Sequence, residues 1–104
     1  MSGRAHDESG QKIAFVLMER FSMNAFASVI EPLRIANRLL GRDYYAWTTY
    51  SLDGNSVMAS NGCEVSVNKS VRELHDADIT LLCTGIDVER LPLDPELGNK
   101  LRRL

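Results

Sequence analysis

Residues 21–41 read FSMNAFASVIEPLRIANRLLG, and this stretch decides the fold. Large apolar residues recur in it every three or four positions, at Phe26, Ile30, Leu33 and Leu40. Polar residues lie between them, at Asn24, Ser28, Glu31, Arg34 and Arg38. This spacing predicts a helix with one buried face and one solvated face.

The ends of this helix carry capping residues. Ser22 can accept a hydrogen bond from the amides of the first turn, and Gly41 can end the helix in a left-handed conformation. Pro32 lies inside the span, where it removes one backbone donor and crowds the carbonyl of Ser28. We therefore expect a kink or an irregular turn at Pro32.

Three apolar runs of strand length surround the helix. They are KIAFVLM at 12–18, YYAWTTYSL at 44–52 and ITLLCTG at 79–85. A continuous apolar strand followed at once by a helix is typical of a parallel sheet covered on both faces. The chain is therefore predicted to be α/β, with a β-α-β unit at its start and a doubly wound sheet.

Smaller elements complete the pattern. Residues 56–59 and 63–67 predict a hairpin around the turn 60–62, since Asn-Gly tolerates the positive φ of tight turns. A short helix is expected at 71–76. Residues 1–11 are polar and predict a disordered tail, Pro92 and Pro95 bracket a loop, and 95–104 read as the opening of another helix.

Length and charge limit the possible functions. A chain of 104 residues is enough for one small domain. Its net charge of −2 comes without a block of basic residues, so we do not expect this segment to bind DNA itself. It has neither a bilayer-spanning apolar run nor a signal-like N-terminus, which predicts a cytoplasmic protein without a membrane partner.

Metal, cofactor and hydrolase motifs are missing. Cys63 and Cys83 lack CxxC spacing, and only His6 and His75 accompany them, so free thiols are favoured over a zinc site. There is no P-loop, GxGxxG, HExxH or GxSxG string. No metal and no cofactor is predicted.

The string FSMNAFASVIEPLRIANRLLGRDYYAWTTYSLDGNSVMASNG, at 21–62, closely resembles the start of the GlxA-like transcriptional regulators. These carry an amidotransferase-like domain of the ThiJ/PfpI type followed by an AraC-type helix-turn-helix domain. The resemblance implies a flavodoxin-like fold, with 12–104 as the N-terminal part of a longer domain that is incomplete at its C-terminus. It also implies that DNA binding belongs to a C-terminal domain absent from this chain.

Ligands of open α/β sheets collect at the carboxyl ends of the strands. These ends predict a ligand-binding set, with simple loop roles as the alternative: Glu19, Phe21, Cys83, Thr84 and Gly85. The backbone N–H of Gly85 is suited to stabilise an anion or a carboxylate. By resemblance, Thr84 and Gly85 match a glycine pair of the ThiJ/PfpI enzymes, with Thr84 in place of the first glycine.

Catalysis is not expected. Cys83 lacks a nearby base and a G-x-C-x-G elbow, so a small buried hydrophobe is favoured over a nucleophile. By resemblance, Ala25 stands where the enzymes place an acid, and Glu31 lies six residues further along the helix, about 9 Å away by helical rise. No catalytic residue is predicted.

Two surface features have competing interpretations. Glu31 and Arg34, at i,i+3 spacing with Arg38 beyond them, favour a solvated ion-pair face over a dimer contact or a carboxylate clamp. The aromatic residues at 44–50 could form a cage for a quaternary amine, but strand alternation favours core packing. His75 is expected at the surface.

The sequence therefore predicts the effector-sensing and dimerisation part of a GlxA-like regulator. The resemblance implies a homodimer and a small polar effector, such as an amino acid or a quaternary amine. Two alternatives stay open. One is a ThiJ/PfpI-type enzyme (a hydratase, deglycase or peptidase), and the other is a protein-interaction module without a small ligand.

Overall fold

Strand β1 forms the centre of the fold. In the computed structural model, which describes residues 10–85, β1 (Gln11–Leu17) leads into helix α2 (Met23–Leu40) and then β2 (Tyr45–Ser51). The remaining elements follow in chain order: β3 (Val57–Met58), β4 (Glu64–Val65), β5 (Lys69–Ser70), the 3-10 helix η1 (Val71–Glu73) and β6 (Ile79–Cys83). The sheet order is β5-β2-β1-β6, with all pairs parallel, and β3 and β4 form an antiparallel pair.

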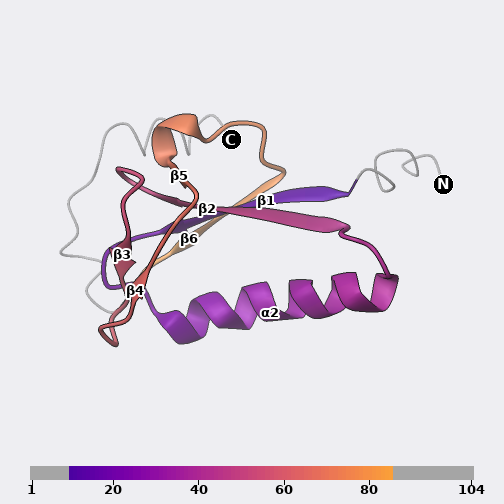
Figure 1. Cartoon of the computed structure of the whole chain (residues 1–104), viewed down its shortest axis with the longest axis horizontal. Coiled ribbons are helices and arrows are strands. Elements are labelled where there is room, and N and C mark those ends of the chain that lie inside the picture. The colour runs from indigo at the N-terminus through magenta and orange to yellow at the C-terminus, as the bar shows by residue number, and fades with distance from the viewer. Residues whose placement is uncertain (1–9, 86–104) are drawn as a thin grey trace.

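Both faces of β1 are buried. On the α2 side, one core cluster contains Ile13, Phe15 and Leu17. On the η1 side, a second core cluster contains Ala14 and Val16. Helix α2 covers one face of the sheet, while η1 lies on the opposite face (Figure 1). The α/β fold with a parallel sheet and a small hairpin is confirmed, because a continuous apolar strand is stable only between two covering layers.

Helix α2 begins and ends where its caps predict. The Ser22 hydroxyl accepts from the Ala25 amide at 3.1 Å, and Gly41 adopts φ 73°. The span is α-helical without interruption, so the irregular turn expected at Pro32 is not present. Pro32 removes only the one backbone donor that would reach the Ser28 carbonyl, and both residues lie on the exposed side of the helix.

One prediction about the buried face of α2 is wrong. Phe26, Ile30 and Leu33 pack against the core cluster as expected, but Leu40 is 56% exposed. The next turn after Leu33 contacts the sheet through Asn37, and Leu40 lies beyond that contact. Apolar spacing alone does not reveal where a helix stops facing the sheet.

The predicted smaller elements differ in extent. The short helix expected at 71–76 is the single turn Val71–Glu73, closed by a capping box between Ser70 and Glu73. Strand β5 was not predicted; its two residues pair with Tyr50 and Ser51. Of the tail predicted at 1–11, residues 1–9 lie outside the described residues, and Gln11 is already the first residue of β1. The helix expected at 95–104 also lies outside the described residues.

Side-chain amides close most of the outer edge of β2. Asn37 donates to the Tyr45 carbonyl and accepts from the Tyr45 amide, both at 2.9 Å. The Asn68 side-chain oxygen accepts from the Thr49 amide at 2.8 Å, and the Asn68 backbone N–H donates to the Thr49 carbonyl at 3.0 Å. An open strand edge invites unwanted pairing, and these contacts occupy it.

We expect Asn37→Ala to lower the free energy of unfolding by about 1–3 kcal/mol, because two part-buried backbone groups lose their partners. Urea unfolding would measure this change. Asn24→Ala is the control, since Asn24 is exposed on the same helix and its loss should stay within about 0.5 kcal/mol. Equal effects of the two variants would contradict the role given to Asn37.

Candidate functional site

The candidate site lies at the carboxyl ends of β1 and β6, where residues 18–22 are held from two sides. On the β6 side, the Met18 amide donates to the Cys83 carbonyl and the Ser22 amide to the Thr84 carbonyl, both at 3.0 Å. On the hairpin side, the Arg20 amide donates to the Met58 carbonyl at 2.7 Å. The Ser60 amide also donates to the Phe21 carbonyl, at 2.8 Å.

The β1–α2 connection passes very close to Gly85. A Cβ placed on Gly85 would lie 2.0 Å from the Arg20 carbonyl oxygen, so no larger residue fits there without movement. Arg20 itself has φ 66°, a left-handed conformation that is uncommon for a residue with a side chain. Backbone strain of this kind collects at ligand sites, and here it coincides with the predicted strand-end position.

A hollow of about 220 Å³ opens beside this connection. It is lined by Glu19, Arg20, Met58, Ala59, Ser60 and Gly62. Glu19 and Arg20 place opposite charges at one small opening, and the hairpin supplies the other wall. The hollow therefore brings a carboxylate and a guanidinium together beside the end of β1.

The structure separates the five predicted ligand residues. Glu19 lines the hollow, while Thr84 and Gly85 lie behind the connection as its backbone support. The Phe21 side chain is fully buried and meets Phe26 edge-on, with ring centroids 6.0 Å apart. The ligand-binding role of these five residues stays a prediction.

The predicted ligand residues do not include Arg20 or the hairpin residues Met58, Ser60 and Gly62, which also line the hollow. The string ASNG at 59–62 belonged to the family resemblance and was the one signal that pointed to them. It was interpreted only as a turn, because its contact with the β1–α2 connection joins residues almost 40 positions apart.

Cys83 lies on the α2 side of β6, half-buried against the core cluster. Burial raises the pKa of the Cys83 thiol above its usual value of 9.0, which keeps it protonated at neutral pH. A catalytic thiol needs the opposite shift.

Position 25, where the resemblance places the acid of the enzymes, and the nearby Glu31 are both exposed. Ala25 is exposed and uses its amide for the helix cap. The Glu31 carboxylate accepts from the Arg34 guanidinium at 2.6 and 3.0 Å, with both side chains about half exposed. That hydrogen bond holds the pKa of Glu31 below its usual value. The solvated ion-pair interpretation is therefore the one that the contacts support.

The aromatic residues also separate as strand alternation predicts. Tyr45 and Trp47 pack on the α2 side, whereas Tyr50 belongs to the core cluster on the η1 side. These side chains do not form one cage, because the sheet separates Tyr45 and Trp47 from Tyr50.

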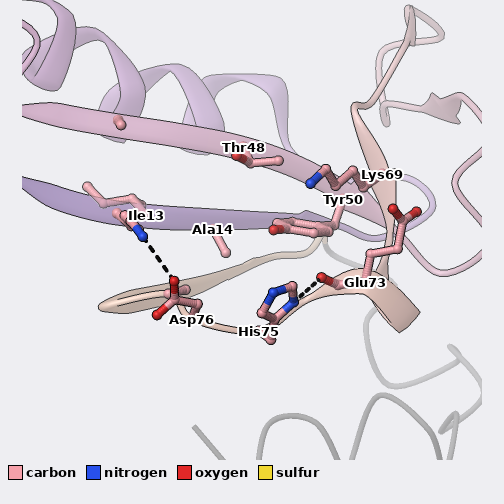
Figure 2. A pocket seen from close by; sticks show the side chains of 11 residues that line it. Ile13, Ala14, Thr48, Tyr50, Lys69, Glu73, His75 and Asp76 are labelled. Atoms are coloured by element: carbon pink, nitrogen blue, oxygen red, sulfur yellow. Dashed lines mark hydrogen bonds and ion pairs between the residues drawn. The ribbon is translucent and has the colours of Figure 1, made fainter.

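A second hollow, of about 320 Å³, lies on the η1 face over the first half of β1 and along β2 from Ala46 to Tyr50 (Figure 2). Lys12 and Asp76 pair across its rim at 2.9 Å, and the Nδ1 atom of the exposed His75 lies 2.8 Å from the Glu73 carbonyl oxygen. On β1 its lining stops at Ala14, before the carboxyl end of that strand. Within residues 10–85, no group of three His, Cys, Asp or Glu side chains could hold a metal ion, and no helix is long and apolar enough to cross a membrane.

Comparisons with known proteins agree with the family resemblance. The HTH-type transcriptional regulator GbdR of Pseudomonas aeruginosa is 39% identical over 80 residues, which is 77% of this chain and 22% of GbdR. CdhR of the same species is 37% identical over 94 residues, which is 90% of this chain and 27% of CdhR. GlxA of Rhizobium meliloti is 31% identical over 85 residues, which is 82% of this chain and 26% of GlxA. The chain thus spans about a quarter of these regulators, and no family model matches it.

Solved structures support the same relationship. An AraC family transcriptional regulator from Pseudomonas putida superposes with a TM-score of 0.70 and 33% identity, over 89% of this chain and 57% of that one. A DJ-1 superfamily protein from Agrobacterium tumefaciens superposes with a TM-score of 0.65 and 24% identity, over 89% of this chain and 47% of that one. This likeness supports the fold alone. The expected resemblance to GlxA-like regulators with a DJ-1/ThiJ-type domain is confirmed.

We expect Cys83 to react roughly tenfold more slowly with iodoacetamide at pH 7.5 than the exposed Cys63, because a half-buried protonated thiol is a poor nucleophile. Mass spectrometry of timed samples would measure both rates. Cys63→Ser leaves Cys83 as the single thiol and serves as the control. A faster reaction at Cys83 would instead favour the enzyme interpretation.

Proposed function

We propose that this chain, a relative of the GlxA-like transcriptional regulators, is part of their non-catalytic effector-sensing domain. Residues 12–104 would form the N-terminal part of that amidotransferase-like domain. DNA binding would belong to a helix-turn-helix domain outside these residues. The raised pKa of Cys83 and the alanine at position 25 favour a non-enzymatic role.

The observation that carries the sensing proposal is the hollow at the end of β1. Its walls come from the β1–α2 connection and the hairpin, two segments joined by backbone hydrogen bonds. Glu19 and Arg20 would pair with the cationic and anionic ends of an amino acid or of a quaternary amine that carries a carboxylate. Binding there would tighten the contact between the hairpin and the start of α2.

We further propose a homodimer formed through the outer side of α2. A second apolar line runs along this helix beside the buried one, through Ala25, Val29, Pro32, Ala36 and Leu39. Leu39 is 83% exposed and Val29 is 39% exposed. In an antiparallel pair centred on Pro32, Leu39 of one copy would face Ala25 of the other, so that large residues meet small ones.

Thermal unfolding of the chain with a panel of amino acids and quaternary amines tests the sensing proposal. A compound that binds the folded state should stabilise it by about 2.7 kcal/mol at 100 times its dissociation constant. Glu19→Gln should weaken the response, whereas Glu64→Gln, on the exposed part of the hairpin, should leave it unchanged. If no compound shifts the midpoint of a cooperatively folded sample, the protein-interaction alternative is favoured.

The dimer has its own test. Light scattering should give the mass of two chains, and Leu39→Glu should reduce it to one, because the variant places a charge in an apolar contact. Met58→Glu changes another exposed apolar residue, on the hairpin, and should leave the mass unchanged. A single-chain mass for the unmodified protein at all concentrations would rule the dimer out.

A further inference from the structure

A groove of about 620 Å³ lies between the C-terminal end of α2 and the start of β2, away from the candidate effector site. It is lined by Arg34, Asn37, Arg38, Gly41, Arg42, Asp43 and Trp47. These two ends meet at the right of Figure 1, where the chain turns from α2 into β2. Three of the lining residues are arginines, and all three are exposed.

Two of the arginines stand one helical turn apart on α2, and the third follows the C-cap Gly41. Arg34, Arg38 and Arg42 follow one another at intervals of four residues, so the first two lie about 6 Å apart along the helix axis. Arg34 already binds one carboxylate, that of Glu31, through its Nε and a terminal nitrogen. The guanidinium of Arg42 lies 5.0 Å from the centre of the Tyr44 ring, which orients it beside the groove. The groove is therefore a basic surface with ordered donors.

The same groove contains an open position on the edge of β2. In a parallel strand, alternate residues direct their backbone groups to alternate sides. Tyr44 accepts from Gln11, the first residue of β1, whereas Tyr45 and Thr49 bond outward to Asn37 and Asn68. Trp47 has the same parity as Tyr45 and Thr49, and β5 begins only opposite Tyr50. The outward N–H and C=O of Trp47 therefore lie on the edge of β2 between Tyr45 and Thr49, whose outward groups are bonded. Within residues 10–85, no backbone segment pairs with the Trp47 groups.

We propose that this groove binds an acidic protein segment in an extended conformation. The segment would pair with the N–H and C=O of Trp47 and place its carboxylates on the arginines. Alternate side chains of an extended strand are about 6.6 Å apart, close to the 6 Å rise between Arg34 and Arg38. The closed positions at Tyr45 and Thr49 limit the contact to about three residues of the segment.

The lining favours a protein segment over nucleic acid. A peptide backbone satisfies both the donor and the acceptor of Trp47, whereas a phosphate can satisfy only the donor. Asp43 also lines the groove, and its carboxylate would repel a continuous row of phosphates. A short peptide can place an uncharged residue beside Asp43, whereas every nucleotide of a nucleic-acid strand carries a phosphate.

The test uses the 104-residue chain and a capped synthetic pentapeptide of alternating threonine and glutamate. Amide NMR titration should show saturable shifts at Trp47 and along 34–42, and hydrogen exchange at the Trp47 amide should slow on binding. Arg38→Glu should weaken binding at least tenfold, and added salt should weaken it further. Lys69→Glu, an equal charge change on β5, should change the affinity less than twofold.

Three results of the peptide measurements would overturn the proposal, and two further comparisons could also contradict it. The three results are an absence of saturable shifts, an equal loss of affinity in Lys69→Glu, and binding without slower exchange at Trp47. The same pentapeptide with glutamine in place of glutamate tests the charge, and equal affinity for it would also contradict the proposal. Tighter binding of a random-sequence DNA duplex than of the peptide would assign the surface to nucleic acid instead. Arg34→Gln is a second variant, should Arg38→Glu not fold.

Discussion

The fold depends on how the five residues that follow β1 are held. The backbone of residues 18–22 bonds to the end of β6 on one side and to the hairpin on the other. These contacts set the start of α2, since Ser22 is both a partner of Thr84 and the N-cap of the helix. One short connection therefore determines the position of α2, the hairpin and the strand-end hollow together.

This arrangement explains why the candidate effector site is where it is. Arg20 takes a left-handed conformation and Gly85 makes room for its carbonyl, so the chain can turn sharply between β1 and α2. The hollow forms where the hairpin is bonded to that turn, while Val57 and Ala59 of the hairpin pack into the core cluster on the α2 side. A ligand there would touch both segments at once, which is the geometry that a sensing domain needs to convert binding into a change of backbone contacts.

Several features could be predicted from the sequence because they depend on local chemistry. The caps of α2, the apolar runs of the strands and the Asn-Gly turn each act within a few residues. The buried faces of β1 followed from its unbroken apolar run. Leu40 was misplaced and β5 was missed for the opposite reason, since burial of one and pairing of the other depend on distant neighbours.

By itself, the sequence determined the order of strands and helix, the ends of α2 and the kinship with GlxA-like regulators, because these are written in local spacing and in short motifs. Only the tertiary structure decided that Phe21 is core while Glu19 and Arg20 face a hollow, and that Asn37 closes the edge of β2. It also decided that arginines four residues apart share one groove with Trp47. These facts join residues that are distant in the chain, and no local preference encodes such contacts.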